Sequence, residues 1–92
     1  GGNPPVFAAL KGKVTQAAYS SSWGNYVKLT NGNGIETLYA HLKEVTVLPG
    51  QQIETGEPIG YMGTSGSSTG VHLHFEVYQN NNRIDPAPLL GL

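Results

Sequence analysis

VHLHFEVY, at residues 71–78, alternates apolar and polar side chains without a break. Successive side chains of a β-strand point to opposite faces, so this period of two predicts a strand. We expect one face to be apolar and buried: Val71, Leu73, Phe75 and Val77. The other face carries His72, His74 and Glu76 in one row.

Similar segments, rich in Val, Ile, Thr and Tyr and separated by Gly and Pro, fill the rest of the chain. They predict strands at Gly12–Ala17, Asn25–Thr30, Ile35–Leu42 and Pro58–Met62, while Gln52–Glu54 should lead to a turn at Gly56. Asn31–Gly34 should form a hairpin turn, because Asn-Gly tolerates the positive φ angles of a type I′ turn. Asn80–Asn82 should close the strand at 71–78, with Ile84–Pro86 leading to a short tail.

No helical period extends over more than a turn or two, so we expect an all-β fold. The segments predict a small antiparallel β-sandwich or partly open barrel. At 92 residues and 38% hydrophobic residues, the chain is one small domain rather than a disordered segment.

The composition excludes several kinds of site and partner. The chain has no cysteine, which excludes disulfides and thiolate zinc sites. Its net charge is −1 with no run of like charge, so we expect no nucleic-acid partner. No apolar stretch approaches the roughly 20 residues of a membrane span. We expect a monomer.

The histidines are the candidate functional residues. His72 and His74 are separated by one residue, which places their Cα atoms roughly 7 Å apart on a strand, so both rings can serve one small site. His41 shares a predicted strand face with Tyr39 and Thr37. Imidazole suits zinc binding or proton transfer near neutral pH. The alternative is that this polar row is only a solvated face of the sheet.

Three other functions have weaker support. The Gly-rich loop Gly63–Gly70 lacks Gly-Lys-Ser/Thr and precedes a strand rather than a helix, which disfavours nucleotide binding. A serine hydrolase would have to combine a serine of this loop with Asp85, far along the chain and outside any nucleophile-elbow pattern. Residues 47–59 resemble the turn pattern of biotinyl and lipoyl carrier domains, but no lysine lies at an apolar hairpin tip.

Several blocks in order resemble the lysostaphin/LytM-type zinc endopeptidases, which cut peptide cross-links of bacterial peptidoglycan. The blocks are Pro5–Ala9, Gly24–Val27, Asn33–Gly34, Leu38–Leu42, Pro49–Gly56, Gly63–Glu76 and Asp85–Pro86. The resemblance covers almost the whole chain. It implies the duplicated-hybrid-motif β-fold, a zinc cofactor, a peptidoglycan peptide as substrate, and an extracellular, cell-envelope or phage-particle location.

The resemblance also implies roles for the three histidines. His74 would be a zinc ligand, while His41 and His72 would orient and deprotonate the zinc-bound water and stabilise the developing oxyanion. These roles agree with general chemistry, since zinc lowers the pKa of its water towards 7 and imidazoles exchange protons near neutral pH.

One family feature is missing from the sequence. The family takes two further zinc ligands from a His-x-x-x-Asp segment upstream of the stretch that matches Pro5–Ala9, and a catalytic zinc needs three protein ligands. The chain opens with Gly1 and has no such segment. Two interpretations stay open. Residues 1–92 are an N-terminally incomplete peptidase domain, or they form a degenerate, non-catalytic module for binding or assembly. Glu76, on the same predicted face as His74, is a further candidate ligand.

Overall fold

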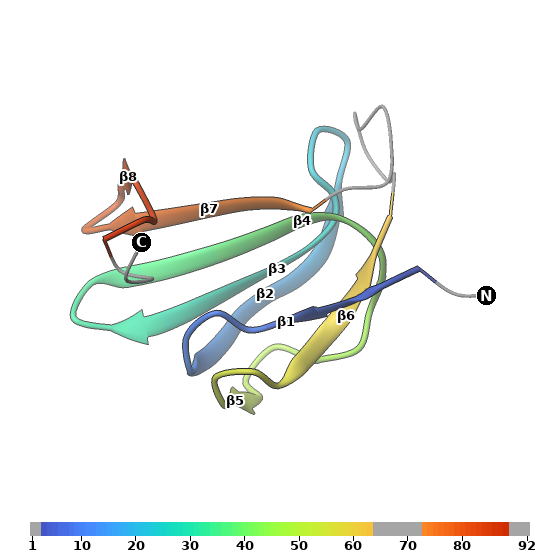
Figure 1. Cartoon of the computed structure of the whole chain (residues 1–92), viewed down its shortest axis with the longest axis horizontal. Coiled ribbons are helices and arrows are strands. Elements are labelled where there is room, and N and C mark those ends of the chain that lie inside the picture. Colours follow the sequence, from blue (N-terminus) through green and yellow to red (C-terminus); the bar gives the residue numbers. More distant parts are fainter. Residues whose placement is uncertain (1–2, 64–72, 89–92) are drawn as a thin grey trace.

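The computed structural model describes residues 3–63 and 73–88, and within these ranges the chain forms one curled antiparallel sheet of eight strands (Figure 1). The strands are β1 (Pro5–Phe7), β2 (Gly12–Ser20), β3 (Gly24–Gly32), β4 (Ile35–Val45), β5 (Gln52–Ile53), β6 (Pro58–Met62), β7 (His74–Gln79) and β8 (Asn82–Ile84). The predicted all-β fold is therefore confirmed. Within the same ranges, no helix is long and apolar enough to cross a membrane.

The sheet is built around the long strand β4. The strand order is β1-β6-β4-β3-β2-β5, and β7 also pairs with β4 and carries β8 on its outer side. One edge of β4 pairs with β3, while the other is shared by β7 along its first half and β6 along its second. Figure 1 shows β7 and β6 diverging from β4 at this fork.

Two tight turns connect the hairpins next to β4. Asn33 and Gly34 have φ angles of 54° and 77°, as the predicted type I′ turn requires, and Gly32 pairs with Ile35 on either side of them. Asn80 and Asn81 repeat this pattern with φ angles of 51° and 69°. The backbone N–H of Asn80 donates to the carbonyl of Gly34 at 2.9 Å, so the two turns pack against each other.

Three short strands, β1, β5 and β8, were not predicted, and β5 pairs with the start of β2. Residues Asn82–Ile84 form β8 rather than part of a turn and a tail, because the turn needs only Asn80 and Asn81 before the chain pairs back onto β7. Pro5–Phe7 forms β1, which pairs with β6 and ends the strand order of the described residues. An edge strand tolerates proline, which lacks an N–H donor.

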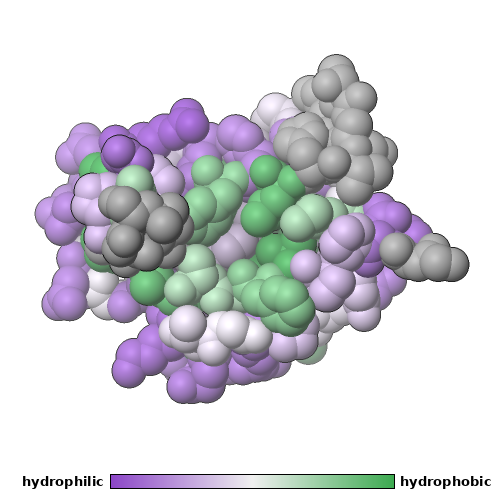
Figure 2. Space-filling view, in the orientation of Figure 1, coloured by the Kyte–Doolittle hydropathy of each residue, from purple (hydrophilic) through white to green (hydrophobic). Residues whose placement is uncertain are grey.

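The core lies on one face of the sheet. Its buried cluster comprises Val6, Ala8, Val14, Val27, Leu29, Tyr39, Leu42, Val47, Ile53 and Ile59. Val77 is buried on this face as predicted, whereas Leu73 and Phe75 are half-buried and pack against the cluster. Figure 2 shows apolar side chains gathered at the centre of the face in view, with hydrophilic ones around them. Val71 lies outside the described residues.

Candidate functional site

His41 lies at the fork of the sheet. The last pair between β4 and β7 is Ala40 with His74, and the first pair between β4 and β6 is Leu42 with Met62. His41 therefore occupies the one position of β4 between its two neighbours. The topology thus brings His41 and His74 together although they are far apart in the sequence.

The backbone of His41 is left-handed, with a φ angle of 60°. Such a conformation is uncommon for a residue other than glycine and marks a point where the surrounding structure dictates the backbone. The pairing of β3 with β4 shifts here, between Asn25 and Val27, as at a β-bulge. The N–H of His41 donates to the carbonyl of Trp23 at 2.7 Å, which fixes this peptide against the β2–β3 turn.

This bulge corrects the predicted position of His41. Tyr39 lies in the core cluster and Thr37 is fully buried beside Val77, so strict alternation would direct His41 to the core as well. The rings of His41 and His74 instead lie 5.7 Å apart between centroids, at an edge-on angle of 75°. Bulges commonly redirect a side chain in this way. His41 is 8% exposed, so it is not part of a solvated face.

Glu76 follows His74 on the same face of β7. The Nε2 atom of His74 lies 2.6 Å from Oε2 of Glu76, and the hydroxyl of Tyr78 donates to Oε1 of the same carboxylate. Arg83, which pairs with Tyr78 across the β7–β8 hairpin, places a guanidinium nitrogen 3.4 Å from Oε2. Only 7% of the Glu76 side chain is exposed. The carboxylate is thus enclosed by three polar partners.

These contacts set the ionisation of Glu76. Burial by itself would raise the pKa of Glu76, but the hydrogen bonds from Tyr78 and His74 and the charge of Arg83 outweigh it and lower that pKa. The same hydrogen bond raises the pKa of the Tyr78 hydroxyl. At neutral pH Glu76 is therefore a carboxylate and Tyr78 is protonated.

Two of the three predicted site residues, His41 and His74, lie next to each other in the structure. The third, His72, lies outside the described residues. Sequence reasoning missed Tyr78 and Arg83. The alternation that gave His74 and Glu76 continues to Tyr78, so the pattern could have included it. Arg83 could be placed only once the Asn80-Asn81 turn was known to return the chain along β7.

The described residues offer only part of a zinc site. They contain no group of three or more His, Cys, Asp or Glu side chains that could hold a metal. His74 fits as one donor, because its Nε2 faces Glu76 and its Nδ1 does not take part in that contact. Both oxygens of Glu76 already have partners, which argues against Glu76 as a ligand.

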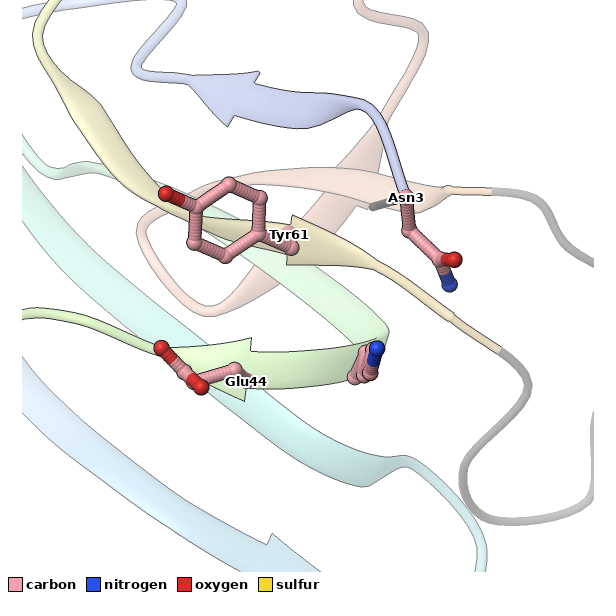
Figure 3. Close-up of a pocket in the computed structure, with 4 residues that line it drawn as sticks. Asn3, Glu44 and Tyr61 are labelled. Atoms are coloured by element: carbon pink, nitrogen blue, oxygen red, sulfur yellow. The ribbon is translucent and has the colours of Figure 1, made fainter. Parts of the chain in front are cut away.

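A hollow of about 290 Å³ lies beyond the fork, over β4 and β6. It is lined by Asn3, Lys43, Glu44 and Tyr61, and Figure 3 shows Glu44 and Tyr61 on neighbouring strands with Asn3 to one side. The amide of Asn3 donates to the carbonyl of Met62 at 2.6 Å. Of the described histidines, neither His41 nor His74 is among these lining residues.

Comparison with known proteins identifies relatives of this fold and sequence. The sequence model described as peptidase family M23 matches residues 1–86. The chain is 40% identical over 82 residues to the DD-carboxypeptidase/endopeptidase Mpg of Neisseria meningitidis and 37% identical over 82 residues to the peptidoglycan DD-endopeptidase ShyC of Vibrio cholerae. Each match covers 89% of this chain and 19% of the relative, so the chain spans about a fifth of the length of these curated relatives.

Solved structures agree with this relationship. The catalytic domain of the antimicrobial peptidase lysostaphin from Staphylococcus simulans superposes with a TM-score of 0.89 and is 33% identical, covering 100% of this chain and 74% of that chain. A zinc-containing peptidase from Vibrio cholerae superposes with a TM-score of 0.85 and is 36% identical, covering 88% of this chain and 25% of that one.

Proposed function

The chain belongs to peptidase family M23, and from this we propose that it is a peptidoglycan-directed zinc metalloendopeptidase domain that hydrolyses cell-wall cross-link peptides. The observation that carries the proposal is the approach of the His41 and His74 rings, 5.7 Å apart at the fork of the sheet. The peptidoglycan DD-endopeptidase ShyC and the antimicrobial peptidase lysostaphin support an extracellular or cell-envelope place of action. A structural relative from Enterococcus faecalis is prophage-encoded, and it supports a phage-particle location as the alternative within this proposal.

We assign His74 as a zinc ligand, and His41 and His72 as the groups that move protons. When bound, zinc would polarise the scissile carbonyl and make water a stronger nucleophile near neutral pH. The backbone hydrogen bond from His41 to Trp23 fixes the peptide that carries the imidazole, and the ring lies against that of His74. From there a neutral imidazole can take a proton from the attacking water, and a protonated one can donate to the oxygen on which negative charge develops.

The remaining zinc donors have to come from elsewhere in the polypeptide. A catalytic zinc takes three protein ligands, and residues 3–63 and 73–88 contain no group of three candidate ligands. We propose that a His-x-x-x-Asp segment upstream of Asn3 supplies the other two. The same shortage supports a second candidate, in which the domain is a degenerate module for binding or assembly. A monomer is the expected state in the first case.

Zinc titration and a cell-wall turbidity assay distinguish these candidates. The 92-residue chain alone should bind zinc weakly and lyse no cell wall. A longer polypeptide that carries a His-x-x-x-Asp segment ahead of Asn3 should bind zinc tightly and release cross-link peptides, and a chelator should stop this release. Strong lysis by the 92-residue chain would contradict the ligand assignment. Tight zinc binding by the longer polypeptide without hydrolysis would favour the degenerate module.

Substitution of the histidines tests their roles. In the longer polypeptide, His41→Ala should lower kcat by about 10²–10⁴-fold, the usual contribution of a general acid or base, while zinc binding persists. His74→Ala should weaken zinc binding itself. Tyr19→Ala removes a ring that is 65% exposed on β2 and should leave both properties unchanged. An active His41→Ala variant would remove His41 from the mechanism.

A further inference from the structure

The contact between His74 and Glu76 is a short, directional hydrogen bond inside the sheet. Its length of 2.6 Å joins Nε2 of His74 to Oε2 of a carboxylate whose side chain is 7% exposed. His74 is more open, with 36% of its side chain exposed. The buried carboxylate of Glu76 is therefore the more restricted of the two groups, and it orients the imidazole of His74.

The two flanking groups fix the carboxylate in turn. Tyr78 donates to Oε1 from the next position on the same face of β7, and Arg83 approaches Oε2 from β8 at 3.4 Å. Each comes from a different direction, so Glu76 cannot rotate away from His74 without losing a partner. The Tyr78 hydroxyl donates to one oxygen and the Arg83 guanidinium lies beside the other, so both contacts favour the ionised carboxylate.

An ionised carboxylate accepts hydrogen bonds and donates none. The proton of the contact must therefore be on Nε2 of His74, and in the neutral ring the lone pair is then on Nδ1. Histidines that bind metals in proteins usually donate their second ring N–H to a carboxylate or carbonyl, which selects the tautomer and orients the ring.

We propose that Glu76 is a positioning residue that fixes His74 in the Nε2–H tautomer and presents Nδ1 to the metal, with Tyr78 and Arg83 holding Glu76 in place. The role of the unprotonated Nδ1 as a metal donor rests on the proposed function. The tautomer itself does not, because it follows from contacts among residues of this chain without a metal.

Nitrogen NMR of the metal-free 92-residue chain tests the tautomer directly. In the chain labelled with nitrogen-15, at a pH where the ring is neutral, His74 should show a protonated Nε2 and an unprotonated Nδ1. Its Nε2–H proton should exchange with water about tenfold more slowly than in Glu76→Gln, since a hydrogen bond to a charged group is lost. An equal mixture of tautomers in the native chain, or equal exchange rates in both proteins, would overturn the proposal.

Two controls separate positioning from general stability. Val77→Ala removes a side chain that is 1% exposed on the opposite face of β7, so it should destabilise the fold while leaving the His74 signals unchanged. Glu44→Gln removes an equivalent charge at the hollow over β4 and β6, where neither His74 nor Glu76 is a lining residue, and it should change neither the stability nor the His74 signals. Should Glu76→Gln fail to fold, Arg83→Gln offers a milder test, because 63% of the Arg83 side chain is exposed. It should speed the exchange about two- to threefold, and no change would count against the role of Arg83.

Zinc affinity supplies the second measurement. In the longer polypeptide used to test the proposed function, Glu76→Gln should weaken zinc binding about 10–100-fold in competition with a chelator. Unchanged affinity would overturn the positioning role. A native chain with a fixed His74 tautomer whose longer form hydrolyses nothing would overturn only the proposed function, and hydrolysis by a protein with mixed tautomers would overturn only the role of Glu76.

Discussion

The two faces of β3, β4 and β7 differ in the side chains that they carry. On one face, direct neighbours are Val27, Tyr39 and Phe75 in one row and Leu29, Thr37 and Val77 in the next. On the other face, the corresponding rows are Lys28, Leu38 and Glu76, and Thr30, Glu36 and Tyr78, with Ala40 beside His74. The first face carries no charged side chain in these rows, whereas the second carries a line of them.

Burial does not distinguish these faces. Leu38 and Ala40 are fully buried on the face that carries Glu76 and His74, just as Leu29 and Tyr39 are on the core face. The faces differ in the kind of interaction that they bury, which is apolar packing on the core face and hydrogen bonds with charged groups on the other. The core face should determine the stability of the domain, and the polar face should determine the orientation of its imidazoles. Four substitutions test this division through the free energy of unfolding, measured by chemical denaturation.

Leu29→Ala should have the largest effect. Leu29 is fully buried in the core cluster, and removing such a side chain leaves a cavity that costs about 2–5 kcal/mol. The NMR signals of His74 should stay in their native positions under folding conditions. A loss below about 1 kcal/mol would show that the curled sheet relaxes to fill the space.

Glu76→Gln should have the next largest effect, about 1–2 kcal/mol, because hydrogen bonds to an ionised group are replaced by weaker neutral ones. Its partners reach solvent, which limits the cost. If this substitution destabilised the domain more than Leu29→Ala, the polar face would have to be counted as part of the core.

Tyr39→Phe should cost about 1 kcal/mol at neutral pH, because the Tyr39 hydroxyl accepts a hydrogen bond from the N–H of Ala9 at 3.0 Å. Burial raises the pKa of Tyr39 above its ordinary value of 10.0. The unfolded chain therefore loses this proton first, so the native protein loses stability as the pH rises from about 10 through the raised value. The variant lacks this loss, and its deficit should shrink over that range. A constant deficit would contradict the raised pKa.

Lys28→Ala should have the smallest effect, below about 1 kcal/mol. The ammonium of Lys28 lies 3.7 Å from the carboxylate of Glu36 and 5.7 Å from the centre of the Tyr78 ring. The side chains of Lys28 and Glu36 are each about one quarter exposed. Added salt should reduce the effect further, since partly exposed charges are screened. Lys13→Ala, an exposed lysine on β2, is the matched control.

The alternation of residues 71–78 predicted most of this division. It placed Val77 and Phe75 towards the core and His74 and Glu76 on the opposite face, and pairing with β4 confirms these assignments within the described residues. It did not predict that Glu76 would be buried, because the partner that encloses it from β8 belongs to a strand that was not foreseen. Periodicity reports the direction of a side chain but not what covers it.

The position of His41 lay beyond such reasoning. Alternation assigns it to the face of Tyr39, and only the left-handed backbone at the fork turns it towards His74. The sequence does not predict this bend, because glycine and asparagine are the usual signals of a positive φ angle and neither occupies position 41. Its cause is tertiary, namely the change of neighbour along β4.

The pairing of β1 with β6 also bears on how the domain assembles in time. The hairpins β2–β3 and β3–β4 join strands separated by short turns, whereas Val6 of β1 pairs with Gly60 of β6 across most of the chain. Closing a longer loop costs more entropy, and contacts between distant residues slow folding. We therefore expect the meander of β2, β3 and β4 to form in the folding nucleus, with β1 docking afterwards. During synthesis β1 emerges well before β6, so β1 stays unpaired with β6 until that strand has been made.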